Sequence, residues 1–83
     1  MRLVQDFLEV TARRLPNKVA LICGEQRLTY AEVDARANRL ATGLVAQGLR
    51  RGGRVVILLA NTVEAVIGIF AVLKAGGTFV VVN

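Results

Sequence analysis

The stretch RVVILLANTVEAVIGIFAVLKAGGTFVVV, residues 54–82, decides the fold. Its apolar start is rich in β-branched residues, which predicts a buried strand over residues 54–59. An Asn-Thr pair then offers a helix cap and a Gly-Gly pair a helix end, so we expect a helix over residues 62–75. Residues 78–82 are again strand-like. This order predicts a right-handed βαβ unit with parallel strands.

The same stretch contains a mostly apolar segment, residues 55–73, in which Glu64 is the sole charge. Its nineteen residues are long enough for a transmembrane helix. The break at Asn61-Thr62 and the β-branched residues before it favour a strand followed by a helix instead. We therefore expect no membrane span.

The strongest local signal before this unit is Thr29-Tyr30-Ala31-Glu32, which matches the S/T-x-x-E capping box. It predicts a helix over Tyr30–Gln47, with Gly48 as its left-handed C-terminal residue. Asp34 is expected on the polar face of this helix. The apolar face is expected to consist of Tyr30, Val33, Ala37, Leu40 and Leu44.

The N-terminal third predicts a helix and a hairpin. Apolar spacings of three and four favour a helix from Leu3 to about Arg14, which Pro16 prevents from continuing. Val19–Cys23 and Arg27–Thr29 are expected to pair across a type II′ turn that Gly24 begins. The fold class is therefore α/β: an N-terminal helix, a short β-hairpin, a long helix and the βαβ unit.

Neither strand of the βαβ unit shows polar alternation, which predicts cover on both faces of their sheet. A chain of 83 residues has few elements to supply that cover. The sequence therefore indicates an incomplete piece of a larger domain, or a chain that needs a partner.

Composition excludes several kinds of site. The chain has no histidine, so no His-based triad or proton shuttle can be built from it. Its single cysteine, Cys23, excludes an internal disulfide and suits a reducing, cytoplasmic compartment. Eleven Lys and Arg against six acids give a net charge of +5, but the cations are scattered and no aromatic residues are interleaved with them. We interpret them as solvated and expect no nucleic-acid partner.

Catalytic patterns are absent from the sequence. Neither of the Gly-rich phosphate-binding motifs, G-x-x-x-x-G-K-S/T and G-x-G-x-x-G, occurs. Glu32 and Asp34 are two positions apart on a helix, point in different directions, and are interpreted as a cap and a surface acid. Asn61 and Asn83 follow the two parallel strands at the sheet edge where α/β proteins bind ligands, but such residues are usually turn residues. We predict no catalytic, cofactor-binding or metal-binding residue; Cys23 is expected to be an inert, buried thiol.

Two motifs resemble a known family. LTYAEV at Leu28–Val33 is similar to the first core motif of the AMP-forming adenylating enzymes, and LKAGGTFVVVN at Leu73–Asn83 to the second. That superfamily includes acyl-CoA synthetases, peptide-synthetase adenylation domains and luciferases. The resemblance implies that residues 1–83 are an N-terminal fragment of an AMP-binding large domain, with no complete domain present.

The resemblance also implies a function for the parent enzyme: it activates a carboxylic acid with ATP and magnesium to an acyl-adenylate and transfers the acyl group to a thiol. This fragment alone is expected to be inactive. Phe79-Val80-Val81-Val82-Asn83 replaces the Tyr-Val-Pro-Leu/Ile-Asp usual in peptide synthetases, which favours acyl-CoA or acyl-carrier ligases. The alternative is a non-catalytic interaction module, stable only as an oligomer or with a partner chain. The sheet would be covered by the remainder of the parent or by self-association.

Overall fold

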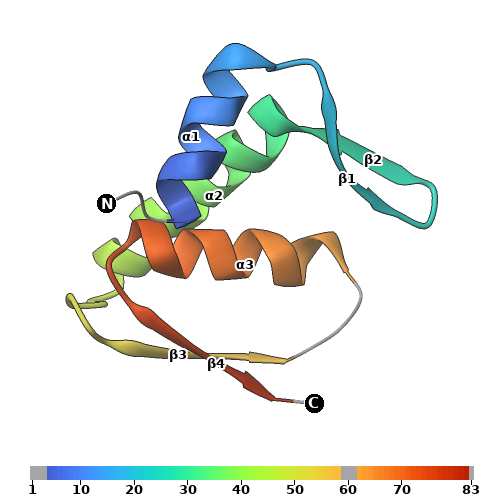
Figure 1. Ribbon diagram of the computed structural model, residues 1–83. Helices are drawn as coiled ribbons and strands as arrows, with labels where there is room; N and C mark the ends of the chain where they lie inside the picture. Colours follow the sequence, from blue (N-terminus) through green and yellow to red (C-terminus); the bar gives the residue numbers. More distant parts are fainter. Residues whose placement is uncertain (1–3, 59–61, 83) are drawn as a thin grey trace.

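The computed structural model describes residues 4–58 and 62–82 (Figure 1). Two separate two-stranded sheets accompany three helices. Helix α3 lies between the second sheet on one side and helices α1 and α2 on the other, while the hairpin extends away from that sheet. The elements are α1 (Val4–Arg14), β1 (Val19–Cys23), β2 (Gln26–Thr29), α2 (Tyr30–Ala46), β3 (Arg54–Leu58), α3 (Val63–Lys74) and β4 (Thr78–Val82).

Strands β3 and β4 pair in parallel, as the sequence predicts. The register runs from Arg54 opposite Thr78 to Leu58 opposite Val82. Thr62 caps α3, because its side-chain oxygen accepts a hydrogen bond from the Ala65 N–H at 3.2 Å. The strand–helix–strand order is thereby confirmed, and the right-handed crossover stays a prediction.

Strands β1 and β2 form the expected antiparallel hairpin. Cys23 pairs with Gln26 on either side of a two-residue turn. Gly24 has φ of +59°, and no residue other than glycine in the described segments has a positive φ, so Glu25 does not. This combination is that of a type II′ turn. A register shift between Val19 and Leu21 adds a bulge that the sequence did not signal.

The start of α2 has an acceptor for each of its first three N–H groups. The Glu32 N–H donates to Thr29 Oγ1 at 3.2 Å, and the Thr29 N–H donates to Glu32 Oε1 at 2.9 Å. The N–H groups of Tyr30 and Ala31 donate to carbonyl oxygens of the 16–18 loop. The predicted capping box is confirmed, and the loop completes it.

Helix α2 ends in a Schellman motif. The Leu49 N–H donates to the Leu44 carbonyl and the Gly48 N–H to the Val45 carbonyl, each at 3.0 Å, while Gly48 has φ of +103°. Helix α3 ends in the same way around Gly76, whose φ is +79°. Both glycine signals in the sequence therefore mark a helix end.

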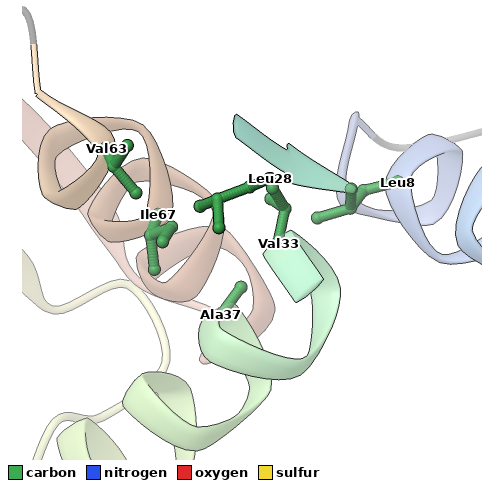
Figure 2. Packing of buried hydrophobic residues seen from close by; sticks show 6 residues of the cluster. All are labelled: Leu8, Leu28, Val33, Ala37, Val63 and Ile67. Atoms are coloured by element: carbon green, nitrogen blue, oxygen red, sulfur yellow. The ribbon is translucent and has the colours of Figure 1, made fainter. Parts of the chain in front are cut away.

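The core lies between the helices and the hairpin, and Figure 2 shows its central cluster. On α2 the expectation for Leu40 is wrong: its side chain is 42% exposed, whereas Ala41 is buried. The buried line of α2 therefore consists of Val33, Ala37 and Ala41, and two alanines suit a close approach of helices. The cluster comprises Leu8, Leu28, Val33, Ala37, Val63 and Ile67.

The expected cover on both faces of the β3–β4 sheet is present on one face within the described residues. Helix α3 packs on that face, where Ile57 reaches Gly68. On the opposite face Val56 and Val80 lie side by side in the register and are 67% and 42% exposed. The described residues therefore leave an apolar face of this sheet open.

Candidate functional site

Three charged side chains, one from each helix, meet where the helices come together. Lys74 ends α3, and its side chain is 5% exposed. Its Nζ lies 2.7 Å from Glu9 Oε1 of α1 and 2.8 Å from Asp34 Oδ1 of α2. The contact with Glu9 is also a hydrogen bond, whereas that with Asp34 Oδ1 is an ion pair without hydrogen-bond geometry. One ammonium thus links all three helices.

The two acids determine the ionisation of Lys74. Burial alone lowers the pKa of an ammonium, but the contacts with Asp34 and Glu9 outweigh it and leave the pKa of Lys74 above its ordinary value. A lysine held in this way keeps its proton at neutral pH. It therefore cannot serve as a general base or an amine nucleophile.

A shallow groove of about 470 Å³ opens beside this junction. Thr42 lies in its wall and donates its hydroxyl to the Asn38 carbonyl at 2.9 Å, which is a local helix contact. The groove therefore brings together few side chains that could bind a ligand or react with it. Its lining consists of Glu9, Asn38, Ala41, Thr42, Val45, Lys74 and Ala75.

The structure separates the two acids that the sequence paired. Glu32 is the expected cap, and the hydrogen bond from the Thr29 backbone, then that from its side chain, lowers the pKa of Glu32. The expectation that Asp34 is a surface acid is wrong, because its side chain is only 20% exposed and pairs with Lys74. Its spacing of three and seven from Ala37 and Ala41 places it on the buried face and could have indicated this.

Cys23 and Tyr30 are both half-buried and pack against the core cluster. This placement supports the interpretation of Cys23 as an apolar side chain and of Tyr30 as part of the core.

Asn61 and Asn83 lie outside the described residues, so the sheet edge they would mark is not described. Within residues 4–58 and 62–82, no group of three or more His, Cys, Asp or Glu side chains could hold a metal ion. No helix in these segments is long and apolar enough to cross a membrane. Eight of the arginines in the described segments are exposed, at dispersed positions: Arg13, Arg14, Arg27, Arg36, Arg39, Arg50, Arg51 and Arg54.

Comparisons with known proteins give a consistent result. The family model described as AMP-binding enzyme matches residues 8–83. The chain is 40% identical over 80 residues to a medium/long-chain-fatty-acid–CoA/3-oxocholest-4-en-26-oate–CoA ligase of Mycobacterium marinum, covering 96% of this chain and 14% of the ligase. It is 42% identical over 79 residues to tyrocidine synthase 3 of Brevibacillus parabrevis, covering 95% of this chain and 1% of that protein.

The fold is also found in solved structures. The N-terminal subdomain of Klebsiella oxytoca NpsA superposes with a TM-score of 0.94 at 31% identity, covering 100% of this chain and 22% of that one. The chain thus spans a small part of the length of the proteins it matches.

Proposed function

This chain belongs to the family of AMP-binding enzymes, and we propose that it forms the N-terminal segment of a ligase that activates a carboxylic acid with ATP. The observation that carries the proposal is the family match over residues 8–83. In the proposed reaction the carboxylate oxygen attacks the α-phosphate of ATP, giving an acyl-adenylate and pyrophosphate. A thiol then displaces AMP to give the thioester. The family match does not favour the alternative of a non-catalytic module.

Residues 1–83 serve this reaction as scaffold, with no complete domain and no catalytic residue among them. The sequence has no Gly-rich phosphate-binding motif and no histidine. Lys74, the most buried cation described, is already neutralised by two acids. The chain alone is therefore expected neither to bind ATP tightly nor to adenylate an acid.

ATP and magnesium are the cofactors proposed for the parent. Magnesium and fixed cationic groups supply charge stabilisation around the phosphates. Glu9 and Asp34, which lie together in the described segments, do not suit a magnesium ion, because both already pair with the Lys74 ammonium. No step of the reaction is assigned to them.

The substrate proposed is a carboxylic acid destined for coenzyme A or a carrier-protein thiol. The support is the Phe79–Asn83 segment, which lacks the Pro and Asp usual in peptide synthetases. The identities of 40% to a fatty-acid–CoA ligase and 42% to tyrocidine synthase 3 are nearly equal and do not separate the two classes. A single cysteine supports a reducing compartment, and we place the parent in the cytoplasm.

The partner proposed for the open face of the β3–β4 sheet is the remainder of the parent enzyme. Val56 and Val80 give that face two adjacent exposed apolar side chains. Val56→Ser should change the unfolding free energy of the 83-residue chain by less than about 0.5 kcal/mol, as surface substitutions do. In the parent the same change should cost several times more. An equally small effect there, with a monomeric parent, would contradict this cover; a dimer dissociated by Val56→Ser would indicate self-association instead.

The activity is tested by ATP–pyrophosphate exchange with the parent enzyme and panels of fatty acids, aryl acids and amino acids. We expect exchange that depends on one class of acid and on magnesium, with thioester formed when coenzyme A or a carrier protein is added. The 83-residue chain is the control and should give no exchange. No exchange with any acid by a folded parent would refute the proposal, and exchange with amino acids only would refute the substrate class.

A further inference from the structure

The cluster of Lys74, Glu9 and Asp34 joins three helices that differ in how many buried apolar side chains hold them in place. Helices α2 and α3 hold each other through a broad apolar contact. Val33 and Ala37 of α2 and Val63 and Ile67 of α3 are buried in one apolar cluster. This contact does not depend on charge.

Among the described side chains, helix α1 contributes fewer buried apolar residues than α2 or α3. Among its described side chains, Leu8 and Ala12 are buried, whereas Phe7 is 58% exposed. Glu9 of α1 also pairs with Lys74 of α3, and this contact is a hydrogen bond as well. Loss of that tie should therefore affect α1 before it affects α2 or α3.

We propose that Lys74 is a charged clasp that holds α1 on the α2–α3 pair, so that the attachment of α1 depends on the contacts of its ammonium with Glu9 and Asp34. The groups facing the ammonium are Glu9 from α1 and Asp34 from α2; in the described segments no other acid is recorded in contact with it. With all three ionised, the cluster carries a net charge of −1.

The two acids differ in what their loss would do. Without Glu9, Lys74 keeps Asp34, so α2 and α3 stay joined and α1 alone loses its charged tie. Without Lys74, two partly buried carboxylates face each other across the α1–α2 contact with no cation between them. Removing one partner of a buried ion cluster is far more harmful than its presence is stabilising. Lys74→Met should therefore loosen α1 more than Glu9→Gln does.

The raised pKa of Lys74 adds a pH dependence whose sign is fixed. A group whose pKa is higher in the folded state stabilises that state below its unfolded pKa. This stabilisation is lost as the pH rises through the folded pKa, above the ordinary lysine value of about 10.4. The attachment of α1 should weaken in that alkaline range, and this dependence should vanish in Lys74→Met.

The test is amide hydrogen exchange on the 83-residue chain, resolved by segment, because exchange reports local opening. In Glu9→Gln, the amides of residues 8–14 should exchange about tenfold faster, the factor expected for one lost hydrogen bond between charged groups. The exchange rates of amides in α2, α3 and the hairpin should stay within about twofold of those in the unsubstituted chain. Glu25→Gln, which removes an exposed acid in the hairpin turn, is the matched control and should change nothing in α1.

Coupling distinguishes the clasp from general destabilisation. Glu9→Gln combined with Lys74→Met should open α1 less than Lys74→Met alone, because it also removes one of the two carboxylates that Lys74→Met leaves facing each other. If Lys74→Met does not fold, Glu9→Gln and Asp34→Asn decide the question. Unchanged exchange of α1 in Glu9→Gln would overturn the proposal. An equal increase in all three helices would overturn it as well, since the junction would then belong to the common core.

Discussion

The contact between α2 and α3 and the attachment of α1 differ in the interactions that hold the helices together. The first buries small and branched apolar side chains, with Ala37, Val63 and Ala71 fully or almost fully inaccessible. Among the described side chains, the second includes Leu8, Ala12 and the ion pair of Glu9 with Lys74. Apolar contact is insensitive to pH and to any single charge, whereas the ion pair depends on both partners. The difference indicates a firm α2–α3 unit with a more conditional α1.

The largest effect should come from the apolar contact itself. Ile67 is 6% exposed and belongs to the central cluster in Figure 2. Ile67→Ala should lower the unfolding free energy by about 3 kcal/mol, through lost transfer energy and a residual cavity. Urea unfolding monitored by circular dichroism measures it. A loss below about 1 kcal/mol would mean that the α2–α3 contact is not the firm unit described here.

The helix ends offer a second test, because both α2 and α3 stop at a left-handed glycine. Gly76→Ala and Gly48→Ala should each cost about 1–2 kcal/mol, since an L residue is strained at positive φ. A Cβ at Gly48 would meet no atom within 4 Å, so backbone strain alone is at work there. Gly43→Ala is the control inside α2, where a Cβ also meets nothing, and it should stabilise the chain by up to about 1 kcal/mol. Equal effects of Gly43→Ala and Gly48→Ala in thermal unfolding would refute this account.

The start of α2 should be next in size. Thr29→Ala removes the hydroxyl that accepts the Glu32 N–H and should cost about 1 kcal/mol. Thr29→Ser keeps the acceptor and is the matched control, with most of the stability expected to remain. Thermal unfolding of both variants measures the difference. If Ala and Ser behave alike, the capping hydrogen bond contributes nothing.

The smallest effect is the pH dependence of the same cap. Because the pKa of Glu32 is lowered, its carboxylate stabilises the fold above the unfolded pKa, and this contribution disappears as the pH falls through the folded pKa. The unfolding midpoints of the unsubstituted chain and of Glu32→Gln should therefore differ at neutral pH and converge as the pH is lowered. Parallel curves for the two proteins would contradict the role given to the ionised Glu32.

The sequence predicted the parts of the fold that depend on neighbouring residues. Thr29 and Glu32 lie three positions apart, and Gly48 and Gly76 follow the helices they end, so each signal could be read locally. Lys74 contacts Glu9 across 65 positions, and no spacing rule connects them. The sequence pattern placed Leu40 instead of Ala41 on the buried face of α2, because periodicity locates an apolar face only to within one position. The apolar strands predicted cover on both faces of the β3–β4 sheet. Strand composition does not show whether that cover comes from the same chain or from another part of the protein, so the open face could not be predicted.

The scaffold role is tested most directly by acyl-CoA formation in a chimera of the Mycobacterium marinum ligase. Its matching 80-residue segment is replaced by the aligned residues of this chain, and thioester formation from that ligase's own fatty acid is measured. If the segment contributes packing and no catalytic residue, the folded chimera should keep its activity, while the 83-residue chain alone forms no thioester. A chimera that folds cooperatively but forms no acyl-CoA would contradict this account, as would activity in the isolated chain.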